Sequence, residues 1–537
     1  MKRCLLLTVG LLSLSIAYAE TKAWNTTSGG AFDADGNWKP SGVPGADDDF
    51  YLTGSQSAPI TLTESVDVAG NVTANWNVFK ETAFDGELAL GSGHILNLLG
   101  SARKLFNGSF KFRLTSGTFR IGEGEQVIMC DNAGSNAKIS VDGPDAKFIC
   151  VPTMNTRTGG TNWWIEAVNG GAIEAKFDLA YTGGNDCHLR VAGVGSKWLA
   201  SSIGSSYLGR HGFGCHLDVE DRGVFESPLD FYVGGLYNRG YAAKGGRNAV
   251  KVDGGTLVAG KGLFIGYDTC SNRMDVVDGG QVFVAGTLSI GHQRYDWQNG
   301  IIQDPNDNKV VVAGADSLVS VTGTVYMPYR NASGSRLTVK DGASFVGKDK
   351  ITIGFETSYA GAGNEIAVAN GATLSVPWLN VYGSANVLAV EDASVSLSEG
   401  LQTGLGGAGT GNDTIRISGR SSSIFANRTK FNRGTTVDVL VPEGGFSNPL
   451  FSAASYFDFG NADGAKTKIV VRLAEDLKHK TTFTLFKSTG TDILPAAGEL
   501  PANVEFELPR GATLDLNNKK EVKVTVRPDT GLILILR

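Results

Sequence analysis

The stretch from Asn272 to Gly291 reads N-R-M-D-V-V-D-G-G-Q-V-F-V-A-G-T-L-S-I-G, and it decides the fold. It holds three short strands with a tight Asp-Gly-Gly turn between the first two and a glycine after the third. Alternation within each strand places apolar side chains on one face and polar side chains on the other. A unit this small cannot bury its own apolar face, so it has to stack on further copies of itself.

Copies of this unit recur eleven times between Asn136 and Phe425, and clear ones lie at Ala249–Val258, Leu337–Val346 and Ile366–Val376. Three short strands per coil predict an all-β fold, a parallel β-helix (solenoid), for which right-handed crossovers are the strong default. Eleven coils at ~4.8 Å each give a stack roughly 50 Å long. The coils begin near Asn136, Asn162, Cys187, Cys215, Asn248, Asn272, Asn308, Gly334, Asn364, Asn386 and Asn412.

Two corners of the coil carry their own residue signature. Asn at the first corner tolerates a left-handed backbone, and its amide can hydrogen-bond along a stack of like residues. We expect such a ladder to set the register between coils, with an Asn-lined binding strip as the alternative. The second corner is Asp-Gly or Asn-Gly followed by Gly or Ala, where Gly supplies a positive φ without steric cost.

The N-terminus predicts an export signal at residues 1–19. Lys2 and Arg3 precede the apolar run Leu5–Ile16, and Ala17-Tyr18-Ala19 offers a cleavage site. The mature chain would be Glu20–Arg537, and its formal net charge would change from −6 to −8. No second apolar run reaches the ~18 residues of a membrane helix. We therefore expect a secreted or surface-associated protein.

The mature chain divides into three regions on this reading. Residues 20–60 form an entry segment whose aromatic side chains cap the first coil. The solenoid covers 61–435, with irregular coils to 135 and regular coils over 136–435. Longer strands over 436–537 predict a β-rich C-terminal cap that covers the open edge of the stack. Its last strand, Leu532–Leu536, is expected to be buried or, alternatively, to pair with another copy of the chain.

Composition excludes several partners. The chain has 72 Gly and only 19% charged residues, which is typical of a turn-rich all-β protein. Its acidic balance and the lack of a Lys/Arg cluster argue against nucleic acid and against anionic lipid.

The entry segment, followed by a Gly-rich β-repeat, resembles secreted β-solenoid proteins of Gram-negative bacteria, of the autotransporter-passenger type. The resemblance implies a location outside the cell or on its outer surface, and an adhesive or structural role. An autotransporter would continue into an outer-membrane barrel, which the sequence up to Arg537 does not contain. We therefore expect release, or retention by a partner.

Metal and disulfide chemistry have few candidates. Export permits disulfides, but the five cysteines Cys130, Cys150, Cys187, Cys215 and Cys270 leave at least one unpaired. Cys187-His188 and Cys215-His216 are expected to stack in successive coils, as an echo of the repeat rather than a metal site. The acidic run Asp47–Asp49 is expected to be a solvated turn, with calcium as the alternative. No other cofactor is expected.

The best candidate site is a pair of long loops, at 234–247 and 292–307. Both should leave the third strand at the same corner, two coils apart, with their bases ~10 Å from each other. Aromatic rings interleaved with charged groups can bind sugars, and function often lies on loops over a rigid scaffold. The residues concerned are Tyr237, Arg239, Tyr241, Lys244, Arg247, His292, Arg294, Tyr295, Asp296, Trp297, Asp304 and Asp307.

Three interpretations of these loops stay open: structural decoration, a contact surface for glycans or cell-surface components, and catalysis. In the last, Arg239 or Lys244 would remove a proton while Asp296, Asp304 and Asp307 carry a metal or act as acid. No nucleophile, zinc or phosphate-loop motif is present in the sequence. The sequence thus favours a non-enzymatic structural or adhesive solenoid, with an extracellular carbohydrate-active β-helix enzyme as the alternative.

Overall fold

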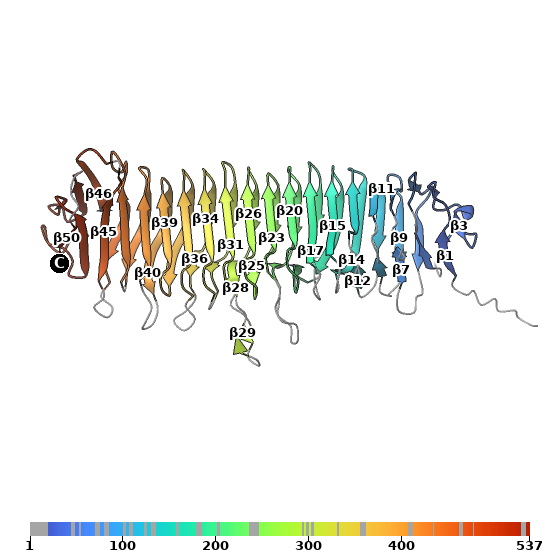
Figure 1. The fold of residues 1–537 in the computed structure, drawn as a ribbon, viewed down its shortest axis with the longest axis horizontal. Helices are drawn as coiled ribbons and strands as arrows, with labels where there is room; N and C mark the ends of the chain where they lie inside the picture. Colours follow the sequence, from blue (N-terminus) through green and yellow to red (C-terminus); the bar gives the residue numbers. More distant parts are fainter. Residues whose placement is uncertain are drawn as a thin grey trace, which may run out of the picture.

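The chain forms one elongated stack of β-coils that runs along a single axis, with β1 at one end and β50 at the other (Figure 1). The computed structural model describes residues 20–527 and 533–536 apart from short gaps. The gaps are 45–48, 53–54, 70–75, 80–84, 100–103, 107–110, 123–125, 130–135, 157–160, 179–184, 201–203, 236–245, 293–294, 297–299, 302–305, 330–331, 355–360, 406–411, 433, 461–465 and 476. The predicted export signal therefore lies outside the described residues.

The first strand of each coil pairs in parallel with the first strand of the next coil, from β5 to β47. These strands are β5 (Ile60–Thr61), β8 (Asp85–Ala89), the first half of β11 (Lys111–Ile121), β13 (Lys138–Asp142), β15 (Thr161–Val168), β17 (Asn185–Ala192), β20 (His216–Glu220), β23 (Ala249–Asp253), β26 (Arg273–Val277), β31 (Lys309–Ala313), β34 (Arg336–Lys340), β37 (Glu365–Ala369), β39 (Val387–Glu391), β41 (Thr414–Ser418), β43 (Thr436–Val441), β45 (Thr467–Leu473) and β47 (Val504–Pro509).

The second strands form a parallel ladder of their own. They are β6 (Val66–Ala69), β9 (Ile95–Leu99), the second half of β11, β14 (Ala146–Thr156), β16 (Ala172–Asp178), β18 (Lys197–Leu199), β21 (Val224–Ser227), β24 (Thr256–Ala259), β27 (Gln281–Val284), β32 (Leu318–Val321), β35 (Ser344–Gly347), β38 (Thr373–Tyr382), β40 (Ser394–Leu405), β42 (Ser423–Phe431) and β44 (Phe451–Asp458).

The third strands complete the coil, and the ends of the long strands β14, β16, β38, β40, β42 and β44 also serve this ladder. The separate third strands are β7 (Trp76–Phe79), β10 (Lys104–Phe106), β12 (Gln126–Met129), β19 (Ser206–Leu208), β22 (Phe231–Val233), β25 (Leu263–Tyr267), β28 (Leu288–His292), β33 (Val325–Met327) and β36 (Lys350–Ile353). The parallel β-solenoid predicted from the repeat is confirmed.

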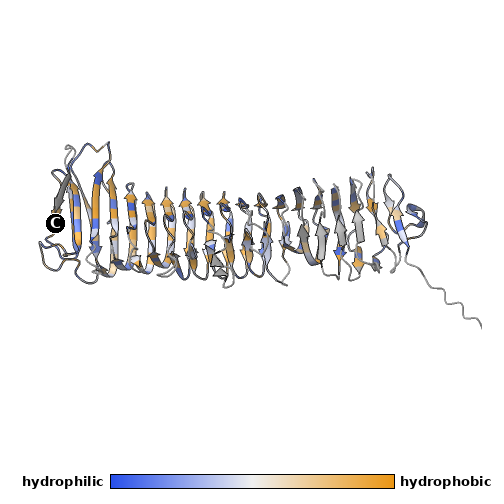
Figure 2. Ribbon diagram, turned by 60° about the horizontal axis from the view of Figure 1, so that its bottom comes forward, coloured by the Kyte–Doolittle hydropathy of each residue, from blue (hydrophilic) through white to orange (hydrophobic). Residues whose placement is uncertain are grey.

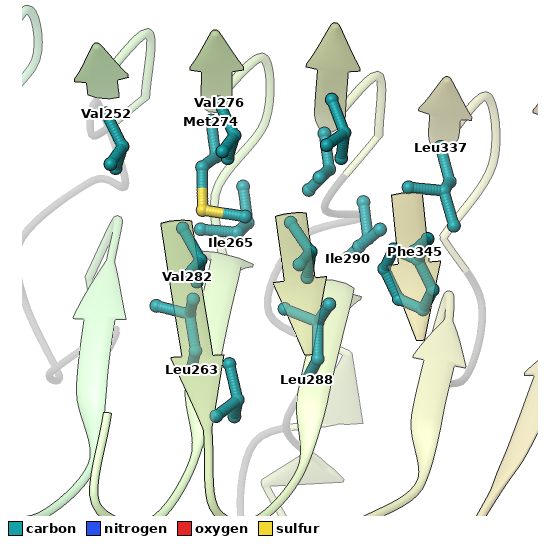
Figure 3. Packing of buried hydrophobic residues seen from close by; sticks show 14 of the residues in the cluster. Val252, Leu263, Ile265, Met274, Val276, Val282, Leu288, Ile290, Leu337 and Phe345 are labelled. Carbon is teal, nitrogen blue, oxygen red and sulfur yellow. The ribbon is translucent and has the colours of Figure 1, made fainter. Parts of the chain in front are cut away.

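The core is a column of apolar side chains inside the coils. Leu263 and Ile265 of one coil lie beside Leu288 and Ile290 of the next, and all four are fully buried (Figure 3). Apolar residues recur from coil to coil along the strands (Figure 2), because alternate residues of each strand point inward. Burial of a Leu or Ile side chain is worth about 1.5–3 kcal/mol, so each added coil strengthens the stack.

The predicted asparagine ladder is confirmed. Asn248 donates its backbone N–H and Nδ2 to Oδ1 of Asn272 at 3.2 and 3.0 Å. Asn272 does the same to Asn308, at 2.9 and 3.0 Å. Asn364 donates to Asn386 in the same way, and all five residues are buried. Ser335 fills the position between Asn308 and Asn364.

The register of this corner needs one correction. The left-handed backbone belongs to the residue before the ladder position, as at Arg247 (φ 55°), Ser271 (58°) and Asp307 (57°). Asn136, Asn162 and Asn412, which we expected to start coils together with the ladder asparagines, belong to this left-handed column. Asn is favoured by hydrogen bonding in the ladder column and by backbone conformation in the left-handed column. In the left-handed column, Nδ2 of Asn162 also donates to Oδ1 of Asn136 at 2.6 Å, so the sequence did not separate the two columns.

The second corner has the positive-φ glycine that the sequence predicts, and the residue before it also has a positive φ. In the turn after β26, Asp278 and Gly279 both have positive φ, 50° and 81°. Two successive positive φ values are those of a type I′ turn, which explains why Asp or Asn precedes the Gly. The next residue, Gly280, packs so closely that a Cβ would lie 2.2 Å from the carbonyl oxygen of Val252.

Both ends of the stack depart from the coil. At the N-terminal end, Trp24, Phe32, Trp38 and Phe50 pack mainly edge to face and belong to the buried core. The elements there are β1 (Thr21–Trp24), β2 (Gly30–Ala31), η1 (Asp35–Asn37), β3 (Trp38–Lys39) and β4 (Asp49–Tyr51).

The C-terminal end keeps the coil for longer than the change in sequence pattern at 435 suggests. Parallel pairing continues through β45 and β47, and antiparallel strands then join them. The strands there are β46 (Thr481–Ser488), β48 (Thr513–Asp515), β49 (Glu521–Val526) and β50 (Ile533–Leu536). The boundaries at 60 and 435 stay predictions.

Candidate binding face

The two long loops leave the stack where we expected. One follows β22 and the other follows β28, and β25 pairs with both of these strands. Their bases therefore lie at the same corner, two coils apart. The second loop contains a small hairpin of β29 (Tyr295–Asp296) and β30 (Gly300–Ile301), and β29 projects beyond the stack (Figure 1).

Only part of the predicted site falls within the described residues. Arg247 and Asp307 are exposed, and each occupies the left-handed position just before a first strand. His292 ends β28 and is half-buried. The backbone of Tyr295 and Asp296 is described, but their side chains are not. The remaining candidates lie outside the described residues: Tyr237, Arg239, Tyr241, Lys244, Arg294, Trp297 and Asp304.

The third strands at this corner carry a surface that the sequence reading missed. We call it the aromatic strip, and its members are half-buried rings on the outer side of the third strands: Tyr207, Tyr232, Phe264, Tyr267, His292, Tyr326 and Tyr329. The strip covers the bases of both long loops, since it spans the coils from β19 to β33.

One column of the strip arises from the register of the strands. Tyr207 pairs with Tyr232, and Tyr232 pairs with Phe264, so their rings stack along the axis. The ring centroids are 4.8 and 4.7 Å apart, with interplanar angles of 10° and 11°. This is the spacing of the strands themselves.

A second column lies beside the first. His292 is stacked between Tyr267 and Tyr329, with centroids 4.5 Å away on both sides. The two columns interlock edge to face, since Tyr232 meets Tyr267 at 4.9 Å and 86°, and Phe264 meets His292 at 5.3 Å and 88°. Aromatic pairs of this kind contribute about 0.5–1.5 kcal/mol each beyond their burial.

This packing decides what the strip offers to solvent. Ring faces are largely used for stacking within the two columns, so ring edges make up much of what these half-buried rings expose. Such a surface can hydrogen-bond and pack along an extended polymer, but it offers few open faces for stacking a sugar. The strip is therefore a stiff platform rather than a set of separate stacking sites.

A charged cluster ends the strip on the N-terminal side. Asp178 takes the position of Tyr207 in the preceding coil, because β16 pairs with β19 at these two residues. Nη1 of Arg210 forms an ion pair with Oδ2 of Asp178. The guanidinium of Arg210 also lies over the ring of Tyr207, 4.8 Å from its centroid. Lys176 lies two residues before Asp178 on the same outer side of β16.

Burial dominates the electrostatics of this cluster. The side chain of Asp178 is 8% exposed, and burial raises its pKa to about 6, although Arg210 and Lys176 oppose the shift. Burial likewise lowers the pKa of Lys176, and it lowers the pKa of His211 to about 4 with help from the charge of Arg210. Oδ1 of Asp178 is buried and has no hydrogen-bond partner among the described residues. Perturbed pKa values in a buried cluster are a general mark of functional sites.

Sequence reasoning missed this cluster because it lies outside the long loops. A signal was present nonetheless. Arg210, Tyr267 and His292 each directly follow a third-strand Gly, which places them in equivalent positions of their coils. Lys176 and Asp178 are charged residues at alternate positions of β16, and the next coil carries Tyr207 in the position of Asp178.

Elsewhere the charges are spread along the solenoid in ion pairs between adjacent coils. A shallow hollow of about 340 Å³ near the N-terminal end is lined by several of them, including Arg113, Lys138 and Glu166. The inter-coil pairs include Lys111–Asp85, Arg113–Glu87, Arg113–Asp142, Lys138–Glu166, Lys147–Glu174, Arg190–Glu220, Lys197–Glu226, Arg336–Glu365, Lys430–Asp458, Lys468–Glu507 and Arg472–Asp438.

The two Cys-His pairs stack in successive coils, as predicted. Cys187 and Cys215 are buried in the ladder position, whereas His188 and His216 point outward. His188 stacks on Trp164, and His216 stacks on His188. A Cys and the His after it thus face opposite sides of the strand and do not share one metal ion. No disulfide joins the four described cysteines, Cys150, Cys187, Cys215 and Cys270.

Within the described ranges, no three His, Cys, Asp or Glu side chains are grouped to hold a metal ion. Asp47 and Asp48 of the acidic run lie outside those ranges, as does the side chain of Asp49. No helix in the described part of the chain is long and apolar enough to cross a bilayer.

Comparison with known proteins does not indicate a function. No protein-family model matches this chain, and no curated protein is significantly similar to it in sequence. The likeness to autotransporter passengers therefore extends only to the parallel β-solenoid fold.

Proposed function

We propose that the protein is a secreted or surface-associated structural β-solenoid that adheres through its third-strand face. The observation that carries the proposal is the aromatic strip, which spans consecutive coils at the corner from which both long loops leave. A rigid scaffold that carries loops and a continuous strip at one corner suits an extended partner better than a small substrate.

The distribution of charge supports adhesion over catalysis. An enzyme should gather its carboxylates and basic groups in one groove, whereas a structural protein should distribute them along the coils. The inter-coil ion pairs follow the second pattern. The alternative, a carbohydrate-active β-helix enzyme, draws its support from buried Asp178, whose raised pKa suits an acid or base.

Adhesion is tested with protein-coated beads washed over immobilised bacterial cells and over purified extracellular polysaccharide. We expect retention of the beads, and loss of retention when Tyr232 and Tyr267 are both replaced by Ala. Beads that wash off like albumin-coated beads would overturn the proposal. Calcium is added and removed in parallel, because the turn at Asp47–Asp49 was the calcium candidate.

Turnover is tested on the same polysaccharides by assaying new reducing ends and unsaturated sugars. We expect none above a heat-denatured control. Product release that is lost in Asp178→Asn would favour the enzyme instead.

Self-association is a third possibility, carried by β50. This strand pairs with β47 along one edge, and no described strand pairs with its other edge. An open edge can add a strand from a second copy. Concentration-dependent sedimentation that disappears on deletion of Leu532–Arg537 would support it, and a constant monomer would exclude it.

A further inference from the structure

The second strands form an uncharged outer face over the middle and C-terminal coils. Over seven consecutive coils, from β24 to β42, the first two outward side chains of each second strand carry no charge. The first strands of the same coils each carry at least one charged outward residue, such as Lys251, Arg273 or Arg416. We call these uncharged second-strand side chains, from Thr256 to Phe425, the neutral face.

One column of the neutral face has charged residues of opposite sign at its two ends. The parallel register of the second strands aligns its members, which include Val258, Phe283, Val346, Ser375 and Phe425. Glu226 precedes the column on β21. Ser452 of β44 continues it, and Lys487 of β46 follows Ser452. The column therefore runs from an acidic residue to a basic one.

The neutral face is open to a flat partner. Two to four residues join each of its strands to the first strand before it, and three or fewer lead on to the third strand, so neither long loop adjoins it. Phe425 is 43% exposed. From β21 to β46, second strands at ~4.8 Å and a width of four residues at ~3.3 Å give a footprint of roughly 600 Å². Two such footprints exceed the ~1,000 Å² that a specific interface needs.

We propose that the neutral face binds the neutral face of a second copy of this chain, with the two stacks running in opposite directions. The two-fold axis of this dimer lies parallel to the strands, at the middle of the column between Val346 and Ser375. Such an interface is isologous, because each copy supplies the same residues. Two sheets that pack face to face lie about 10 Å apart, with their side chains interdigitated. The contact is separate from the aromatic strip and from the edge of β50.

The aromatic residues of the column are complementary in this arrangement. Phe283 lies on the second strand of the ladder after Glu226, and Phe425 lies on the second strand before Lys487. Reversal of one stack therefore places Phe283 of each copy opposite Phe425 of the other. Aromatic residues are enriched at protein interfaces and contribute much of their binding energy.

The charged residues at the ends are complementary too. Glu226 of each copy lies opposite Lys487 of the other. Glu521, which pairs with Lys487 across β46 and β49, then lies opposite β18, whose Lys197 forms an ion pair with Glu226. Stacks that ran in the same direction would instead bring Glu226 to the level of Glu226, and Lys487 to the level of Lys487. Like charges across an interface are unfavourable, so the charges select the opposed arrangement.

The test is sedimentation velocity of the purified chain over a series of concentrations. Phe425→Asp places a charge on the neutral face without disturbing the core. Leu440→Asp is the matched control, because Leu440 is 40% exposed and points outward from a first strand, β43. We expect a dimer whose dissociation constant rises about tenfold or more in Phe425→Asp and stays within about twofold in the control.

Three results would overturn the inference. The first is a monomer at every concentration, and the second is a dimer that both variants weaken equally. The third is a dimer that Phe425→Asp leaves intact but that disappears on deletion of Leu532–Arg537, which would assign the contact to β50. Each of these results leaves adhesion through the aromatic strip standing, because the bead assay tests it separately.

A charge exchange tests the direction of the two stacks. Glu226→Lys and Lys487→Glu should each weaken the dimer about fivefold, because each places like charges at both ends of the interface. The two changes together restore the opposite charges, so the double variant should dimerise within about twofold of the unchanged chain. A double variant that is as weak as either single variant would contradict the opposed arrangement.

Discussion

Two stacks of like residues run along the same coils of this solenoid, one inside the coil just before the first strands and the other on the outer side of the third strands. The asparagine ladder of Asn248, Asn272 and Asn308 is fully buried, and each amide is bound by its neighbours. The stack of Tyr207, Tyr232 and Phe264 is half-exposed. The contrast shows that repetition alone does not distinguish a fold element from a candidate binding surface, whereas exposure to solvent does.

The ladder is tightly bonded inside the coil, which suits a device that fixes register. The strip lies on the outer side of the third strands and ends in a charged cluster around buried Asp178, and the two long loops run from these strands to the ladder residues Asn248 and Asn308. A change at the ladder should therefore affect stability, and a change at the strip should affect binding more than stability.

The largest expected effect comes from Asn272→Ala. The truncation leaves the backbone N–H and Nδ2 of Asn248 buried without an acceptor, at about 1–3 kcal/mol each. We expect a loss of about 2–5 kcal/mol, measured as faster hydrogen exchange in β23 and β26 and as a lower urea midpoint. Asn517→Ala, at an exposed asparagine, is the control and should change little. Equal rates of hydrogen exchange in the two variants would show that the ladder does not stabilise these coils.

The next effect is a dependence on pH that comes from two buried carboxyls. Burial raises the pKa of Asp413 to about 6 against the hydrogen bonds from Asn386 and Gly404, and burial likewise raises the pKa of Asp178 to about 6 against Arg210 and Lys176. An unfolded Asp titrates near ~3.9. The folded state thus holds these protons more tightly, so both groups favour folding fully below about pH 4, and this contribution is lost as the pH rises to about 6.

Each group should contribute about 3 kcal/mol to this change. Urea midpoints measured between pH 4 and 7 test it, and Asp413→Asn should flatten the slope. A slope of the opposite sign in the unchanged chain would show that these carboxyls are ionised and well solvated in the folded state.

Removal of a ring from the strip should cost less stability. Tyr232→Ala deletes contacts with Tyr207, Phe264 and Tyr267, each worth at most about 0.5–1.5 kcal/mol at this half-exposed surface. Tyr232→Phe keeps the stack and serves as the control. Thermal unfolding of the two variants separates the stacking energy from the hydroxyl, and no difference between them would mean that the rings contribute nothing by stacking.

The smallest expected effect is an increase in stability. Cys215 occupies the ladder position before Asn248, and its backbone N–H already donates to Oδ1 of Asn248 at 3.0 Å. Cys215→Asn should extend the ladder by one amide bond and stabilise the stack by about 1 kcal/mol. A lower urea midpoint would mean that this coil cannot accept the amide.

Much of the fold was predictable because strand alternation and turn glycines are local signals. The strands around Asp278 and Gly279, the stacking of Cys187 on Cys215 and the asparagine ladder all followed from residue types read in register. The one-residue offset of Asn136, Asn162 and Asn412 did not, since a left-handed position and a ladder position select the same residue.

The candidate site was less predictable. The loop bases lie at the expected corner, but Tyr232 and Tyr267 come from different coils and meet only when the coils are stacked. Likewise, Asp178 and Arg210 are distant in sequence, and only the register of β16 on β19 brings them together. A contact between coils depends on the length of each intervening loop, which varies along this chain.

The most direct test of the account compares two variants in the bead adhesion assay, both well below their unfolding temperatures. Asn272→Ala breaks the ladder, and the double change of Tyr232 and Tyr267 to Ala breaks the strip. The account predicts retention of the ladder variant and loss of the strip variant from immobilised cells and extracellular polysaccharide. Equal retention of both variants would contradict the assignment of the third-strand corner as the binding face.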